Sequence, residues 1–190
     1  MLKRTTLIIT MVAVSIFILV ALDVTGNTTD LKLTQDMEVI DGMYGTGIIA
    51  KNTTIYKNKV VIKKVFVLQV HGTYKKEVYD IEIALNSNEI RNMIEGFTML
   101  QKMSKTWSKK NNITSEGFGI KKGVYVCAAP KNGSIIYGVV VISGNEKIYT
   151  YFDAGSVNTI KTVLKKGAAF IRQQKPQIRP KTDNRTFFDI

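Results

Sequence analysis

Two short turn signals, Asn132-Gly133 and Gly144-Asn145, constrain the fold of this chain more than any other feature of its sequence. Asn-Gly is the favoured pair of a type I′ hairpin turn, and Gly-Asn suits a second two-residue turn. The segments around them are rich in valine, isoleucine and tyrosine, which favour strands. The two turns therefore predict a three-stranded antiparallel meander over residues 124–152, with its register fixed at both ends.

This register divides the meander into two faces. One face is expected to be core and holds Val124, Val126, Ala128, Tyr137, Val139, Val141, Ile148, Thr150 and Phe152. The opposite face is expected to hold three rows: Tyr125 with Val140 and Tyr149, Cys127 with Gly138 and Tyr151, and Ala129 with Ile136 and Lys147. A sheet face that meets water usually alternates to polar residues. We therefore expect this tyrosine-rich face either to be covered or to bind a partner.

Alternating apolar residues predict three further strands before the meander, at residues 47–56, 60–70 and 74–85. A turn near Asn58 would join the first two. Together with the three strands of the meander and two expected helices, these strands predict an α+β fold. Its sheet is expected to be mostly antiparallel, with about six strands.

The connection between the second and third of these strands is expected to be a tight hairpin. Gly72 and Thr73 fit the two loop positions of a type II′ turn, because glycine adopts positive φ without strain. In that register Phe66 lies opposite Tyr79 on the apolar face of the hairpin.

Two amphipathic helices are expected. Asn86 or Ser87 offers the N-cap of the first, and Glu89 completes a capping box with Asn86. Ser156 is expected to cap the second helix, and Pro176 to end it. The apolar stripe of the first helix comprises Ile90, Ile94, Phe97, Leu100, Met103 and Trp107, and that of the second Ile160, Val163, Leu164, Gly167 and Ile171.

The folded domain is thus expected to span residues 46–172. Residues 27–45 are polar with few periodic apolar positions, which is typical of a membrane-proximal spacer. Residues 173–190 contain two prolines and alternating charges, which indicates a flexible basic tail. Near its end, Phe187 and Phe188 are apolar and are expected to dock on a sheet edge or a partner.

The N-terminal residues 1–26 resemble a membrane-insertion signal. Lys3 and Arg4 precede an apolar run from Leu7 to Leu22. This run is slightly longer than an ordinary signal-peptide core and slightly shorter than the about 20 residues that span a bilayer comfortably. We favour an uncleaved single-pass anchor that leaves the rest of the chain outside the cytoplasm, because basic residues stay on the cytoplasmic side. The alternative is secretion after signal cleavage.

The charge of the chain favours anionic partners. Of 27 basic and 15 acidic residues, only Lys3, Arg4 and Asp23 lie in the first 26 positions, so the remainder has a net charge of +11. Such a field attracts lipid headgroups, envelope polymers, nucleic acid or acidic proteins. Nucleic acid fits least well, because only Lys147 is expected beside the tyrosines and the export signal directs the domain away from it.

Catalytic motifs are not supported by the sequence. A nucleophilic Cys127 would need a base, and the single histidine, His71, is expected at the tip of a distant hairpin. Asp80 and Glu82 lie two apart on a strand and are expected to balance lysines such as Lys63. One histidine and one cysteine do not make an ordinary zinc site, and no phosphate-binding glycine loop occurs. We expect no catalytic residues, metal or cofactor.

The sequence therefore predicts a membrane-anchored, extracytoplasmic, non-catalytic binding or assembly module of an envelope system. Its partner is expected to be a protein or an anionic envelope polymer, and its oligomeric state stays open. The alternative is a secreted enzyme or effector that acts on a polyanionic substrate. The expected binding residues are Tyr125, Tyr149, Tyr151, Lys147, Phe187 and Phe188.

Overall fold

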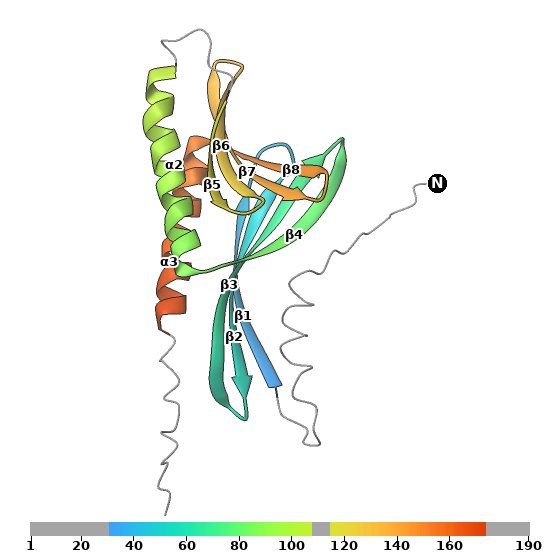
Figure 1. The fold of residues 1–190 in the computed structure, drawn as a ribbon, viewed down its shortest axis with the longest axis vertical. Coiled ribbons are helices and arrows are strands. Elements are labelled where there is room, and N and C mark those ends of the chain that lie inside the picture. The colour runs from blue at the N-terminus through green and yellow to red at the C-terminus, as the bar shows by residue number, and fades with distance from the viewer. Residues whose placement is uncertain (1–30, 108–114, 174–190) are drawn as a thin grey trace, which may run out of the picture.

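The computed structural model of the chain describes residues 31–107 and 115–173 (Figure 1). In these ranges an α+β fold is present, with a mostly antiparallel sheet of eight strands and two helices, so the predicted class is confirmed with more strands than expected. The expected anchor, Phe187 and Phe188 lie outside the described residues, and no described helix is long and apolar enough to cross a membrane. In chain order the elements are β1 (Leu31–Asp41), β2 (Gly47–Lys57), β3 (Val60–Tyr74), β4 (Glu77–Leu85), α2 (Ser87–Trp107), β5 (Glu116–Lys121), β6 (Val124–Lys131), β7 (Ser134–Ser143), β8 (Glu146–Phe152) and α3 (Ala154–Arg172).

In the part of the chain that the structure describes, the same unit occurs twice: four antiparallel strands followed by one helix. The strands run in the order β1-β2-β3-β8-β7-β6-β5, and β4 pairs with the other side of β3. The two halves of the sheet meet where Thr73 of β3 pairs with Tyr149 of β8. A bridge between Met43 and Tyr151 ties the β1–β2 connection to β8. The sheet is therefore continuous across both units.

Both helices lie side by side on one face of the sheet (Figure 1). Each also reaches the strands of the other unit, since α2 packs against β5 and β6, and α3 packs against β1, β2 and β3 as well as β7 and β8. Glycines allow this close approach. A Cβ atom on Gly96 of α2 would lie 2.7 Å from Cγ2 of Val126, and one on Gly167 of α3 would lie 2.4 Å from the Phe66 ring.

The core fills the space between the helices and this face of the sheet. Burial of such large apolar side chains is the main driving force for folding. The largest fully buried side chains are Phe66, Phe97, Phe152, Ile48, Leu68, Ile90, Met93, Leu100, Ile148, Ile160 and Leu164.

Strand β1 lies in the segment for which the sequence indicated a spacer. Residues 31–41 pair with β2 along their full length without a register shift. Because β4 ends where Leu85 pairs with Phe66, residues 60–65 of β3 pair with β2 alone. The ends of β1, β2 and β3 therefore project beyond the rest of the sheet as a three-stranded arm (Figure 1).

The β3–β4 turn differs from the sequence prediction. Its loop residues are Lys75 and Lys76, both with positive φ, of 47° and 69°. Phe66 lies opposite Leu85 and not Tyr79, although the two faces of the hairpin hold the predicted residues. Gly72 is a strand residue, and a Cβ atom on it would lie 2.5 Å from Cγ2 of Ile148 in β8. Its small size is needed for contact between strands and not for a turn.

The predicted meander is confirmed as β6, β7 and β8, with the predicted pairing of their core residues. Asn132, Gly133 and Gly144 have positive φ, as the two turns require. One pairing was wrong: Lys147 lies beside Ile142 and not in the row of Ala129. An additional strand, β5, pairs with β6 and forms the edge of the sheet.

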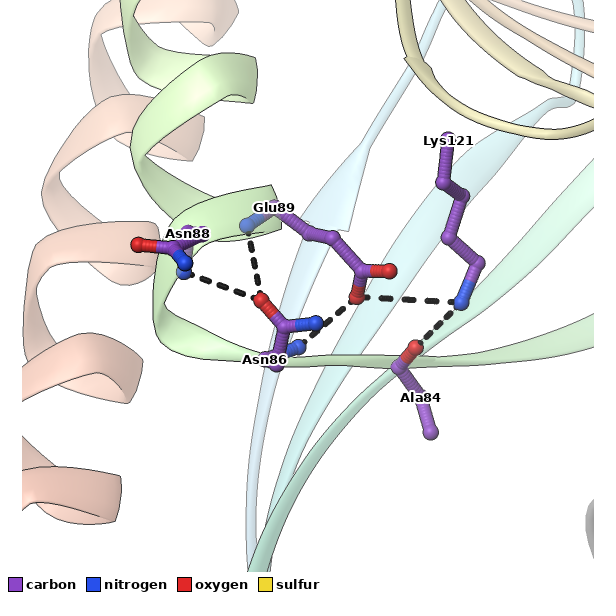
Figure 2. A network of polar contacts seen from close by, with 5 residues as sticks. All are labelled: Ala84, Asn86, Asn88, Glu89 and Lys121. Atoms are coloured by element: carbon purple, nitrogen blue, oxygen red, sulfur yellow. Dashed lines mark hydrogen bonds and ion pairs between the residues drawn. The ribbon is translucent and has the colours of Figure 1, made fainter.

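The cap predicted for the first helix is present (Figure 2). The backbone N–H groups of Asn88 and Glu89 donate to Asn86 Oδ1 at 2.9 and 3.0 Å, and the Asn86 N–H donates to Glu89 Oε2 at 2.8 Å. Lys121 of β5 lies 3.8 Å from the same carboxylate oxygen and donates to the Ala84 carbonyl at 2.7 Å. These contacts tie the end of β4, the start of α2 and β5 together.

The predicted cap of the second helix was wrong. Asp153 is the N-cap of α3, and its side chain accepts a hydrogen bond from the backbone N–H of Ser156 at 2.7 Å. Asp153 follows β8 directly, so the helix begins earlier than expected. The apolar stripe is as predicted, with Ile171 half-buried.

Candidate functional site

The sheet face opposite the helices carries the predicted tyrosine rows. Tyr125 lies beside Val140, which lies beside Tyr149, and the next row joins Cys127, Gly138 and Tyr151. On the edge strand β5 these rows continue with glycine, since Gly119 pairs with Tyr125 and Gly117 with Cys127. The face is thus aromatic at its centre and bare of side chains at one edge.

Tyr44 joins this face from the β1–β2 connection. The Met43 N–H donates to the Tyr151 carbonyl at 2.6 Å, and the Tyr151 N–H donates to Thr46 Oγ1 at 3.0 Å. These two hydrogen bonds hold the connection against β8. As a result, the Tyr44 ring meets the Tyr151 ring edge to face, with centroids 5.9 Å apart and an interplanar angle of 79°.

Tyr149 and Tyr151 form a platform of two nearly parallel rings. They lie two residues apart on β8 and therefore on the same face, with centroids 6.0 Å apart and an interplanar angle of 6°. The Lys131 ammonium lies 4.3 Å from the Tyr44 ring centroid and 5.9 Å from that of Tyr151. A cation over aromatic rings is held electrostatically by their π faces. We define the tyrosine face as Tyr44, Tyr125, Tyr149, Tyr151, Cys127 and Lys131.

No described helix covers the tyrosine face, because α2 and α3 both pack on the other side of the sheet. Tyr44 is 58% exposed and Tyr125 is 39% exposed. Tyr149 and Tyr151 are half-buried. Partial burial, with the neighbouring Tyr149, raises the pKa of the Tyr151 hydroxyl above its ordinary value.

Gly138 has no side chain, which leaves a space on the tyrosine face between Cys127 and Tyr151. The side chains of these two residues fill this space. A Cβ atom there would lie 3.0 Å from Cys127 Sγ and 3.9 Å from Cδ1 of Tyr151. Cys127 is half-buried, and burial raises the pKa of its thiol to about 11. Since the thiolate is the reactive form, Cys127 is a poor nucleophile at neutral pH.

The structure brings most of the predicted binding residues together. Tyr125, Tyr149 and Tyr151 share one face, and Lys147 is exposed on the same side of β8. Tyr44 and Lys131 were not predicted. Lys131 precedes the Asn-Gly turn on the Tyr125 side of β6, and its position could have been read from the register. Tyr44 could not, because its place depends on the contact with β8.

The other candidate groups are dispersed over the same sheet surface. His71 is a strand residue of β3, and its Nδ1 lies 2.9 Å from Asp80 Oδ1. Two strands separate β3 from β6, which places His71 about 14 Å or more from Cys127 at the usual strand spacing. Glu82 pairs with Lys51 at 2.6 Å and not with Lys63 as predicted. Among the described residues, no group of acidic, histidine and cysteine side chains could hold a metal ion.

No protein-family model and no curated protein matches the chain. Among solved structures, the chain is similar to that of SsgB, a protein in which mutations correlate with longitudinal cell division during sporulation of Streptomyces coelicolor. The identity is 9%, and the match covers 76% of this chain and 90% of that one. The TM-score of 0.28 is too low to support an argument about function.

Proposed function

We propose that this protein is a non-catalytic binding module of a cell envelope, anchored by residues 1–26, that contacts an anionic partner through the tyrosine face. The observation that carries the proposal is the platform of Tyr149 and Tyr151, with Lys131 beside it, on a sheet face that neither described helix covers. Partly exposed aromatic clusters of this kind are more typical of contact surfaces than of solvated sheet faces.

The chemistry of the tyrosine face suits a partner with flat apolar groups and negative charge. Aromatic side chains supply contact area at low entropic cost, because a tyrosine has few rotatable bonds. Lys131 and Lys147 supply positive charge on the same side of the sheet. The net charge of +11 beyond residue 26 adds a long-range attraction for anions.

A pull-down with the full chain tests the proposal. The tagged protein in detergent is mixed with a detergent extract of the envelope of its source cells. We expect Tyr125→Ser with Tyr149→Ser to lower the captured partner at least tenfold, and salt to weaken capture, because charge contributes to the contact. Digesting the extract with protease beforehand distinguishes a protein partner from a polymer.

The matched control is Tyr56→Ser, because Tyr56 is a half-buried tyrosine of β2 outside the tyrosine face. Thermal unfolding shows whether each variant is folded. Equal capture by the wild type and the folded double variant would contradict the binding site. The location is tested separately: a C-terminal reporter that is active only in the cytosol would contradict the extracytoplasmic assignment.

A further inference from the structure

Strand β1 is an open edge of the sheet within the described residues, where it pairs with β2 alone. Unpaired strand edges are templates for pairing with another chain, and proteins usually protect them with prolines, bulges or charged residues on the exposed face. β1 has no proline, its pairing with β2 has no bulge, and its charged residues Lys32, Asp36 and Glu38 lie on the helix-side face. Leu33, Met37 and Val39 on one of its faces are 58%, 59% and 65% exposed.

The two faces of β1 differ sharply in character. Leu33, Met37 and Val39 lie on the face opposite the helices, because they alternate with Ile40, which is buried in the core. The helix-side face carries the polar residues Lys32, Thr34, Asp36 and Glu38. A strand added at this edge would therefore need apolar residues on one face and complementary charges on the other.

A second copy of β1 meets both needs. When two β1 strands pair antiparallel with the two-fold axis at Gln35, Leu33 lies opposite Met37 of the second copy, and Lys32 lies opposite its Glu38. Thr34 then lies opposite Asp36. Each pair occurs twice, since a two-fold contact is the same on both subunits. This register joins apolar to apolar and positive to negative residues along the strand.

Neighbouring registers are less favourable. A two-fold axis at Asp36 places the two Asp36 carboxylates opposite each other, and an axis at Met37 places Asp36 opposite Glu38. Like charges directly opposite are destabilising. An axis at Thr34 pairs fewer residues and leaves Leu33 opposite Gln35. The charge pattern therefore disfavours the axes at Asp36 and Met37, and the pairing of Leu33 with Met37 favours the register centred on Gln35 over the axis at Thr34.

The shape of the protein gives room for this contact. Gln35 pairs with Thr53 of β2, and Thr53 pairs with Val65 of β3. This row lies in the projecting arm, beyond the last pair of β4 at Phe66 and Leu85. Helix α3 contacts β1 through the ion pair of Lys166 with Glu38 at 3.0 Å, on the helix side of the strand. In Figure 1 the arm extends away from the bulk of the strands.

We propose that the protein forms a two-fold symmetric dimer in which the β1 edges of two copies pair antiparallel around Gln35. The two arms then form one six-stranded sheet. On its face opposite the helices, Leu33 and Met37 of both copies form a shared apolar strip. The dimer is independent of the proposed binding function, because the tyrosine face belongs mainly to β6 and β8.

Disulfide trapping tests the register directly. In the full chain in detergent, with Cys127→Ala as background, Gln35→Cys is oxidised under mild conditions. Residues directly opposite in an antiparallel pair have Cα atoms about 4.5–5.5 Å apart, within the range of a disulfide. We expect rapid covalent dimers of Gln35→Cys. Val39→Cys is the control, because Val39 is highly exposed but lies about 27 Å from its counterpart in this register.

Sedimentation of the same full chain tests the association itself. Lys32→Glu places two glutamates opposite each other and is expected to weaken the dimer at least tenfold, whereas Lys59→Glu in the exposed β2–β3 turn leaves it unchanged. Equal cross-linking at positions 35 and 39 would overturn the proposal. A wild-type protein that sediments as a monomer would also overturn it. In such a monomer, slow amide exchange of β1 would show that another segment or partner covers the edge.

Discussion

Gly167 of α3 lies directly on the ring of Phe66 in β3, so closely that a Cβ atom on the glycine would be 2.4 Å from the ring carbon Cδ2. Phe66 is fully buried and pairs with both β2 and β4. The contact therefore sets the distance between α3 and the middle of the sheet. It also fixes the helix at the base of the projecting arm.

Gly167→Ala is expected to destabilise the protein by about 1–3 kcal/mol, because the rigid ring cannot move aside without repacking the core. Helix propensity alone would predict the opposite sign, a gain of about 1 kcal/mol. Urea unfolding of the two proteins measures the difference. Gly155→Ala in the same helix is the control, since its Cβ would meet only the Asp153 side chain, at 3.3 Å. A higher unfolding midpoint for Gly167→Ala would contradict this interpretation.

Gly72 has a similar role at the junction of the two halves of the sheet. A Cβ atom there would lie 2.5 Å from Cγ2 of Ile148 and 2.9 Å from the Tyr149 carbonyl. We expect Gly72→Ala to lower stability by about 1–3 kcal/mol through overpacking. Gly119→Ala serves as the matched strand control, because its Cβ would make an ordinary contact of 3.7 Å with the Tyr125 ring. The expectation fails if both variants unfold at the same urea concentration.

The cap at the start of α2 makes a separate, local prediction. Asn86→Ala removes the acceptor of two backbone N–H groups and is expected to lower stability by about 1 kcal/mol, as is typical of N-cap removal. Asn88→Ala is the control, since Asn88 is exposed and contributes only its backbone N–H to the cap. Chemical denaturation measures both. An equal loss in the two variants would show that the Asn86 side chain has no special role.

The parts of the fold that the sequence predicted are those set by local chemistry. Asn132-Gly133 and Gly144-Asn145 require positive φ, so they fix the turns and hence the pairing of Val126 with Val139 and of Tyr125 with Val140. The cap at Asn86 is equally local. Once the register was known, three of the four tyrosines of the tyrosine face followed from alternation alone.

The parts that the sequence did not predict depend on contacts between distant segments. Gly72 was interpreted as a turn residue, but it is small because β8 lies against it. The actual turn uses Lys75 and Lys76, which local propensity disfavours at positive φ. Tyr44 reaches the tyrosine face only because its connection is hydrogen-bonded to β8. Sequence periodicity carries no information on such pairings.

Cys127 gives a prediction that depends on pH. Burial raises the pKa of its thiol from 9.0 to about 11, so the folded protein keeps a proton that the unfolded chain releases between these values. The stabilisation from Cys127 is therefore fully present below pH 9 and is lost as the pH rises through about 11. A shift of this size corresponds to roughly 2–3 kcal/mol.

Comparison with Cys127→Ala isolates this effect from the titration of tyrosines and lysines. Between pH 8 and pH 11, the wild type is expected to lose more stability to urea than the variant, whose own defect is independent of pH. Alkylation by iodoacetamide provides a second measurement, because only the thiolate reacts. In the folded protein its rate should be half-maximal near pH 11, whereas in the unfolded chain it should be half-maximal near pH 9. A folded protein whose rate is half-maximal near pH 9 would show that the Cys127 thiol meets water, and that the space above Gly138 is open.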